Sequence, residues 1–324
     1  MNYLRVLDEL RGFQVVAASD LSRDRLAQVK ERYPLVNTVV QAGEVIDDPK
    51  IEAVVLATPA GLHFEQAVRA LKAGKHVLVE KPLALEVAQC EQLVALAGSQ
   101  KRTLMVDHTF LYNDAVRRMK EYVRAPDFGR VYYLCSRRNN LGPIRGDVSA
   151  IWDLAPHDIS IFNHLLDEGP AEVSATTGSY LRADRADVAF LVLRYPSGVL
   201  GHIQVSWIEP SKVREVVVVG DRRRIVFDDV NIAESLRIFD RGVGVSGDVD
   251  SFGDFKYLIR DGDILSPRIV TREPLRNACT DFLESLQNAR EPLSGGRIGR
   301  SVVAALHAAE ESVRRNGAFV RIPS

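Results

Sequence analysis

A charged pair follows a short apolar run in the segment 76–82, which reads HVLVEKP. The apolar, β-branched residues predict a buried parallel strand, which ends at Pro82 because proline cannot donate a ladder hydrogen bond. Glu80 and Lys81 would then lie just past the carboxyl end of a strand, where open α/β sheets bind their ligands. A lysine there can donate a hydrogen bond to a substrate oxygen and polarise it. Taken alone, such a pair is more often part of a solvated loop.

A second pair of polar residues lies in the segment 151–158, which reads IWDLAPHD. If this segment is helical, Asp153 and His157 share one face, because they are four residues apart. Histidine titrates near neutrality and is the commonest general base, and a neighbouring carboxylate can orient it or bind a substrate hydroxyl. A metal site would need a third ligand, which no H-E-x-x-H arrangement supplies, so no metal is expected. The alternative is a helix start with solvated polar side chains.

The elements that must position these residues alternate along the first third of the chain. Such alternation predicts a parallel sheet with helices on both faces. Strands are expected at 13–18, 39–40, 53–57, 76–79 and 103–106, and helices at 2–10, 23–33, 62–73 and 86–97.

A carboxylate follows the first of these strands. Asp20 would accept hydrogen bonds from the ribose diol of an adenosine and repel a 2′-phosphate, which favours NAD over NADP. Arg23 and Arg25 leave NADP open, because an arginine can accommodate that phosphate. Asp20 fits a helix-capping role equally well, since a helix with Ser22 as its N-cap is expected to follow.

Thr58 and Pro59 end the strand expected at 53–57, at the point where a doubly wound sheet changes direction. Their backbone could approach the nicotinamide half of a dinucleotide. His63, at the start of the helix that follows, either borders the same site or is a polar group satisfied within the protein.

A doubly wound nucleotide domain normally opens with a strand and a turn of the form G-x-G-x-x-G. Here the chain begins within the first helix, so we expect Met1 to be an internal methionine of a longer protein, or the domain to be shortened. Weak cofactor binding by the chain as written would follow, because that turn and helix start bind the pyrophosphate. Residues 242–247, GVGVSG, match the motif only as a string, and we expect a flexible loop there.

The pattern changes after about residue 125. Strands are expected at 131–136, 172–180, 188–195, 199–207, 213–219 and 224–227, a loop at 241–263, and helices at 150–166, 275–289 and 297–315. The predicted fold class is α/β: an N-terminally truncated Rossmann domain (a doubly wound parallel sheet) at 1–107, then an α+β domain with an open, largely antiparallel sheet at 108–324.

Composition excludes several classes of protein. The 324 residues carry a formal net charge of −1, so no electrostatic footprint for nucleic acid or an anionic membrane is present. No apolar run is long enough to span a membrane, and no signal peptide opens the chain. The three cysteines lack C-x-x-C spacing, which argues against a disulfide framework or zinc site and predicts a cytoplasmic protein.

In combination these segments, with DHTFLYN at 107–113, resemble the glucose–fructose oxidoreductase/inositol dehydrogenase (Gfo/Idh/MocA) family over nearly the whole chain. The resemblance implies hydride transfer between NAD or NADP and a secondary alcohol of a sugar-like substrate, with Lys81 and His157 catalytic and Asp153 assisting. It places Asp20, Thr58, Pro59, His63, Glu80 and Lys81 against the cofactor, and His108, Asn139, Asp153 and His157 against the substrate.

The second half is most similar to members that act on nucleotide sugars or uronates, and we expect a homo-oligomer, a dimer or tetramer, formed through the open sheet. Three alternatives stay open. They are an NAD-dependent glycosidase on the same scaffold, a non-catalytic binding protein, and an inactive fragment that lacks the glycine-rich turn.

Overall fold

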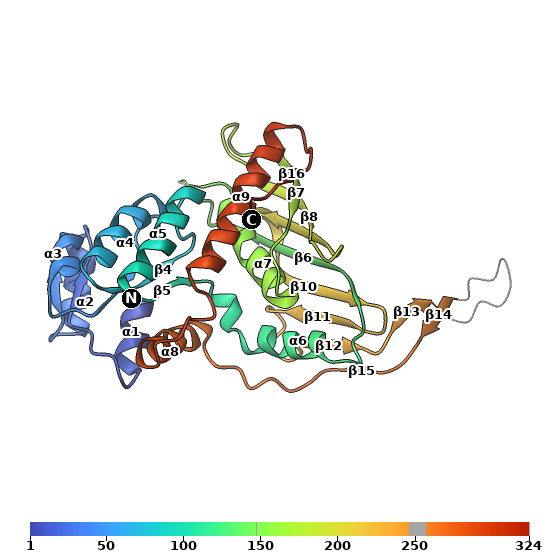
Figure 1. The fold of residues 1–324 in the computed structure, drawn as a ribbon, viewed down its shortest axis with the longest axis horizontal. Coiled ribbons are helices and arrows are strands. Elements are labelled where there is room, and N and C mark those ends of the chain that lie inside the picture. The colour runs from blue at the N-terminus through green and yellow to red at the C-terminus, as the bar shows by residue number, and fades with distance from the viewer. Residues whose placement is uncertain (147, 246–256, 324) are drawn as a thin grey trace. The chain divides into compact units, whose positions relative to one another are not determined.

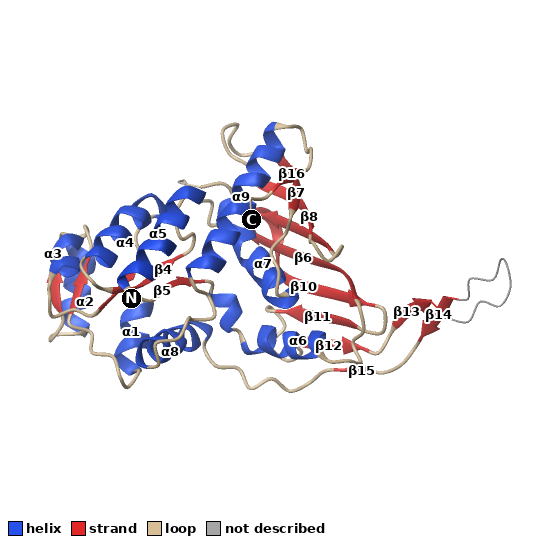
Figure 2. Ribbon diagram, viewed as in Figure 1, coloured by secondary structure: helices blue, strands red, loops and turns tan. Residues whose placement is uncertain are grey.

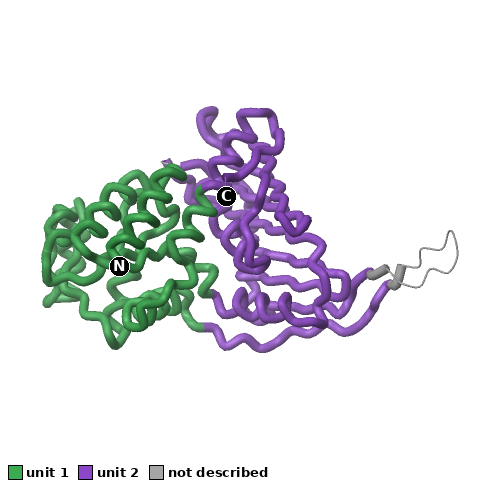
Figure 3. Tube along the Cα trace, in the orientation of Figure 1, with its two compact units in different colours: residues 1–112, 272–303 green, residues 113–271, 304–324 purple. Residues whose placement is uncertain are grey.

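The computed structural model describes residues 1–146, 148–245 and 257–323. The chain forms two compact units, shown in Figure 3: residues 1–112 with 272–303, and residues 113–271 with 304–324. The predicted division at 107/108 differs from this grouping mainly in the stretch 272–303, which returns to the first unit. Helix α8 (Pro274–Gln287) packs there against α1 (Asn2–Glu9), and Phe13 stacks on Phe282 with ring centroids 6.3 Å apart.

The first unit has the predicted alternation of strand and helix (Figures 1 and 2). Its strands pair in parallel wherever they pair. After α1 its elements are β1 (Ala17–Ser19), α2 (Arg23–Arg32), β2 (Asn37–Val39), α3 (Ala42–Asp47), β3 (Ala53–Leu56), η1 (Ala60–Leu62), α4 (His63–Lys72), β4 (His76–Glu80), α5 (Val87–Gln100), β5 (Leu104–Asp107) and η2 (Thr109–Tyr112).

Local sequence explains the limits of these elements. The Ser22 hydroxyl accepts a hydrogen bond from the Arg25 backbone nitrogen and caps α2, as predicted. Gly74, with a φ of +73°, follows the last turn of α4, in a left-handed conformation that glycine adopts without penalty. The three central residues of β4 are fully buried, because β4 lies between β3 and β5 with helices over the sheet.

The parallel sheet is divided. Strands β1 and β2 form a two-stranded sheet, β3, β4 and β5 form a three-stranded one, and within the described residues β1 and β3 are not paired. The division falls where the usual doubly wound order has a central strand. The predicted fold class is confirmed as α/β, with a parallel Rossmann-type sheet in the first unit and a largely antiparallel sheet in the second.

The second unit is built on a nine-stranded sheet with the order β15-β12-β11-β10-β6-β9-β8-β7-β16. Only β6 and β9 pair in parallel, so the sheet is largely antiparallel. Its strands are β6 (Val131–Leu141), β7 (Glu172–Gly178), β8 (Val188–Arg194), β9 (Leu200–Ser206), β10 (Ile208–Gly220), β11 (Arg224–Asp228), β12 (Leu236–Phe239), β15 (Ile264–Leu265) and β16 (Val320–Arg321).

Helices α6 (Asp114–Arg124) and α7 (Ala150–Leu166) pack on one face of this sheet (Figure 1). Helix α9 (Gly296–Arg314) contributes its first residues to the first unit and the rest to the second. None of the helices within the described ranges is long and apolar enough to cross a bilayer.

Two expectations for this half of the chain need correction. The predicted loop at 241–263 contains β13 (Gly242–Val245) and β14 (Tyr257–Arg260), which pair with each other and so satisfy their backbone groups. The glycine motif therefore begins in a strand, and its last two residues, 246 and 247, lie outside the described residues. Strand β6 also extends five residues beyond the predicted 136, because β10 continues to pair with its polar end.

Candidate active site

Strands β4 and β5 bring the charged segment beside a second polar segment. Glu80 is the register partner of Asp107, so Lys81 and His108 follow at the same edge of the sheet. The Tyr3 hydroxyl, from α1, lies 2.9 Å from Glu80 Oε1 and 2.5 Å from Asp107 Oδ2. One phenolic proton can be donated to only one of these carboxyl groups, so a second proton is needed to satisfy all three oxygens.

Below about pH 6 the Asp107 carboxyl carries that second proton. Burial, and then the charge of Glu80, raise the pKa of Asp107 to about 6. Burial, and then the neighbouring carboxyl groups, also raise the pKa of Tyr3 far above its usual value, so the phenol keeps its proton. The edge of the sheet therefore holds a proton-sharing group of two carboxyls and one phenol directly beside Lys81.

His108 is the second unusual group at this edge. Its side chain is buried, and neither ring nitrogen has a hydrogen-bond partner within the described ranges. Burial, followed by the charge of Lys81, lowers its pKa to about 3, so the ring is neutral near pH 7. Buried polar groups are normally hydrogen-bonded. A polar group of a bound ligand could supply the hydrogen-bond partner that the His108 ring lacks.

His63, by contrast, uses both ring nitrogens within the protein. Its Nδ1 lies 2.7 Å from the Pro82 carbonyl oxygen and its Nε2 lies 2.8 Å from the Thr58 carbonyl oxygen. The ring is 1% exposed. It joins the chain segments that leave β3 and β4, and it has no nitrogen left for a ligand.

The remaining residues predicted for the cofactor lie at the same ends of their strands. The Thr58 hydroxyl donates a 2.8 Å hydrogen bond to Gln66, and Pro59 is exposed. Asp20 follows β1, where its Oδ1 accepts a 2.8 Å hydrogen bond from the Ser22 backbone nitrogen. Its Oδ2 lies 3.4 Å from the mostly exposed guanidinium of Arg25. Asp20 therefore supports the start of α2 and still presents a partly exposed carboxylate oxygen.

In the second unit, α7 carries Asp153 and His157 one turn apart, as predicted. The Trp207 indole nitrogen donates a 3.1 Å hydrogen bond to Asp153 Oδ2, and Arg145 lies 3.4 Å from Asp153 Oδ1. The sequence does not predict these two partners, because they come from the junction of β9 and β10 and from the loop before α7. Together they fix the carboxylate in place, while His157 remains partly exposed.

A buried ion pair anchors α7 to the sheet. Arg138 on β6 donates two hydrogen bonds, of 2.8 and 3.0 Å, to the two carboxylate oxygens of Asp158, and both side chains are almost fully buried. Asn139, the next residue of β6, is 4% exposed, and its buried Oδ1 has no partner among the described residues.

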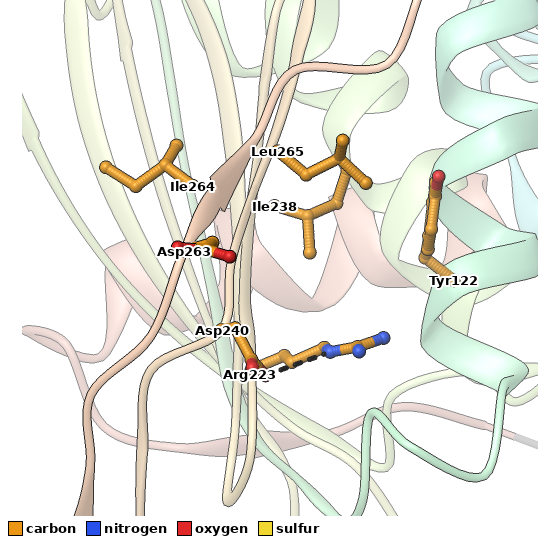
Figure 4. A pocket seen from close by; sticks show the side chains of 7 residues that line it. All are labelled: Tyr122, Arg223, Ile238, Asp240, Asp263, Ile264 and Leu265. Carbon is orange, nitrogen blue, oxygen red and sulfur yellow. Dashed lines mark hydrogen bonds and ion pairs between the residues drawn. The ribbon is translucent and has the colours of Figure 1, made fainter.

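One pocket in the second unit is separate from these residues. It has a volume of about 490 Å³ and is lined by Tyr122, Arg223, Ile238, Asp240, Asp263, Ile264 and Leu265, as Figure 4 shows. The guanidinium of Arg223 in this pocket already pairs with Asp240 at 3.4 Å and with Asp127 at 2.6 Å. None of the predicted site residues lines it.

The comparisons with known proteins bear on both units. Residues 1–108 match the model described as "Oxidoreductase family, NAD-binding Rossmann fold", and residues 116–226 match the Gfo/Idh/MocA C-terminal domain. The chain is 27% identical over 259 residues to UDP-N-acetylglucosamine 3-dehydrogenase of Acidithiobacillus ferrooxidans, covering 79% of this chain and 77% of that protein. It is 26% identical over 309 residues to myo-inositol 2-dehydrogenase of Thermotoga maritima, covering 92% and 88%.

Solved structures agree on the fold. A levoglucosan dehydrogenase in complex with NADH and levoglucosan superposes with a TM-score of 0.82 at 19% identity, over 99% of this chain and 95% of that one. The two domain matches follow each other in the order expected from the sequence, and they confirm the resemblance. The chain belongs to the Gfo/Idh/MocA family of NAD-binding oxidoreductases.

Proposed function

We propose that the protein is an NAD(P)-dependent oxidoreductase that transfers a hydride between the nicotinamide and a secondary alcohol of a sugar-like substrate. The observation that carries the proposal is Lys81 at the carboxyl end of β4, next to a buried proton-sharing group, in a chain of this family. The dehydrogenase names of the two curated relatives support the same class of reaction.

The residues present fit both the adenosine end and the nicotinamide end of a dinucleotide. Asp20 offers a carboxylate oxygen to a ribose diol, and the Thr58-Pro59 and Glu80-Lys81 segments follow two adjacent strands where a nicotinamide would bind. The orphaned ring of His108 offers an uncharged donor or acceptor at the same edge. When bound, the cofactor supplies or accepts the hydride, and the protein supplies placement.

The side chains of this chain then handle the proton and the developing charge. His157 takes the proton of the reacting hydroxyl as a general base. Lys81 donates a hydrogen bond to the same oxygen and stabilises its negative charge. Asp153, held by Trp207 and Arg145, orients His157 or binds a neighbouring hydroxyl.

For the substrate we propose a nucleotide sugar or a uronate. Arg145 beside Asp153 adds a cation to a region otherwise suited to hydroxyl groups, which favours a substrate that carries phosphate or carboxylate. The relative that acts on UDP-N-acetylglucosamine supports this choice. We also propose a cytoplasmic homo-oligomer, for which the open face of the large sheet is the contact surface.

The experiment is a comparison of Lys81→Ala and His157→Asn, with Lys72→Ala, an exposed lysine at the end of α4, as the matched control. We expect Lys81→Ala to lower kcat by about 10²–10³-fold, as for loss of an oxyanion donor. His157→Asn should lower kcat by about 10²–10⁴-fold and remove the acidic limb of the pH–rate profile.

Near-normal turnover in either variant would contradict the assigned role of that residue. Release of a free sugar without net change in the cofactor would identify the transient oxidation of a glycosidase instead. Cofactor and substrate binding without any turnover would indicate a binding protein.

A further inference from the structure

We propose that His63 is a positioning residue, whose ring sets the backbone that presents Lys81. The inference rests on the proposed function, in which Lys81 acts on a substrate oxygen. It assigns His63 a role that differs from direct contact with the cofactor.

The hydrogen-bond ladder between β3 and β4 ends just before Lys81. The last register pair of these strands is Leu56 with Val79. Beyond it no further register pair joins the two segments, and the carbonyl oxygens of Thr58 and Pro82 each lie within hydrogen-bond distance of one nitrogen of the His63 ring. The ring is buried, and one nitrogen faces each carbonyl, so it links the two segments beyond their ladder. Because both carbonyls are acceptors, a ring with one N–H donates to one of them and a ring with two N–H groups donates to both.

Lys81 lies between two anchors. On its amino side, the Glu80 carboxylate accepts a hydrogen bond from Tyr3 of α1. On its carboxyl side, the Pro82 carbonyl is held by His63 of α4, and Leu83 is fully buried. The backbone of Lys81 is therefore fixed on both sides, while its own side chain is only partly buried.

Such anchoring matters for a lysine. Its ammonium group lies at the end of a flexible four-carbon stem, so the backbone must be well placed for the group to meet one oxygen reliably. A displacement of about 1 Å in a reacting group can lower a rate by about 10²-fold. Loosening the Pro82 carbonyl should therefore reduce turnover without removing any group that touches the substrate.

The experiment uses two substitutions that each keep one of the two contacts. In His63→Asn the side-chain amide can lie near the position of Nδ1 and keep the contact with Pro82. In His63→Gln it can lie near Nε2 and keep the contact with Thr58. We expect His63→Gln to lower kcat about 10- to 100-fold and His63→Asn to lower it less than about threefold, with little change in substrate KM in both.

Two controls accompany this pair. His76 lies at the other end of β4, where it accepts a hydrogen bond from the Thr103 backbone nitrogen, so His76→Asn and His76→Gln should both keep the parent kcat. In a Lys81→Ala background, His63→Gln should cause no further loss, because a residue that acts through Lys81 has nothing left to position.

A readout without activity is hydrogen exchange in the protein free of cofactor. We expect faster exchange in the peptide 81–86 for His63→Gln than for His63→Asn, with equal melting temperatures. Unchanged exchange in that peptide for His63→Gln overturns the inference, as does equal loss of kcat in the Asn and Gln variants. Full activity of Lys81→Ala would instead overturn the proposed function, and the exchange result would still decide whether His63 holds the loop.

Discussion

The edge of the sheet beside Lys81 contains two side chains whose pKa values move in opposite directions. Burial and Glu80 raise the pKa of Asp107 from 3.8 to about 6, and burial and Lys81 lower the pKa of His108 from 6.5 to about 3. Between about pH 3 and 6 the folded chain thus keeps a proton on the carboxyl while the imidazole is neutral, which reverses their usual order of protonation. Both effects have one cause, since removal from water penalises the charged form of either group.

This reversal predicts a pH dependence of stability. Asp107 contributes stability below about pH 4, which is lost as the pH rises through 6, because the folded state binds its proton more tightly. His108 contributes stability above about pH 6.5, which is lost as the pH falls through 3. Between pH 4 and 6 the two contributions oppose each other, so the parent protein should show only their difference.

Single substitutions should separate the two contributions. In Asp107→Asn the free energy of unfolding should rise with pH between 4 and 6 more steeply than in the parent, by at most about 1.4 kcal/mol per pH unit. In His108→Gln the free energy of unfolding should fall with pH over the same range, relative to the parent, because the rise contributed by His108 is removed. Urea unfolding at pH 4, 5 and 6 measures both, with the exposed Asp8→Asn as control. Parallel pH curves for all four proteins would contradict the predicted protonation states.

Asp20 allows a prediction about cofactor choice at the same scale. Asp20→Asn keeps an oxygen that can accept the hydrogen bond from the Ser22 nitrogen, so α2 should begin as before. It removes the negative charge that repels a 2′-phosphate. We expect the ratio of kcat/KM for NADP to that for NAD to rise about tenfold, which is 1.4 kcal/mol. A parent enzyme that already prefers NADP would show that Arg23 or Arg25 dominates.

At the scale of elements, the placement of α7 depends on a buried ion pair. Arg138 and Asp158 are 4% and 1% exposed, and they join α7 to β6 one residue from His157. Removing one partner leaves a buried charge without compensation, which typically costs about 3–5 kcal/mol, whereas replacing both partners by apolar residues is often close to neutral.

We therefore expect Arg138→Met to lower the free energy of unfolding by about 3–5 kcal/mol. The double variant Arg138→Met/Asp158→Leu should recover most of that loss. Urea unfolding of the two variants, with the single variant Asp158→Leu completing the cycle, measures the coupling. Additive effects of the two substitutions would show that the pair contributes no coupling to the attachment of α7.

At the scale of the whole molecule, the large sheet has α6 and α7 packed on one face and exposed side chains on the other. The inward residues of β8 and β9 are buried under α7, while alternating residues on the other face are exposed. Tyr133, Phe190 and Leu200 are 45%, 43% and 48% exposed, and Tyr133 is the register partner of Leu200. Exposed aromatic and aliphatic side chains on one surface are typical of a contact with another protein chain.

The exposed side chains on this face allow a test of the proposed homo-oligomer. If two copies meet through it, the double variant Tyr133→Asp/Leu200→Asp should have a lower mass in light scattering than the parent, because buried unpaired carboxylates are costly. Leu35→Asp is the control, since Leu35 is 97% exposed and lies in the first unit. A parent protein that is monomeric at all concentrations, or a double variant of unchanged mass, would contradict the proposal.

The sequence by itself determined most of the elements and named the candidate residues, although it did not predict the helices α3 and α6. The helix expected at 150–166 has those bounds in the structure, and β4 places Lys81 where the apolar run and Pro82 predicted. These features are local, since helical spacing, strand composition and turn residues act over a few neighbouring positions. The family resemblance came from the same local segments read in order.

Only the tertiary structure decided how those residues are held. Tyr3 reaches Glu80 across 77 positions and Asp107 across 104, and Trp207 reaches Asp153 across 54. Likewise, 272–303 joins the first unit, and the two carbonyls at His63 belong to different strand ends. No periodic pattern encodes such partners, because a hydrogen bond between distant segments is defined only once the sheet has aligned the ends of its strands.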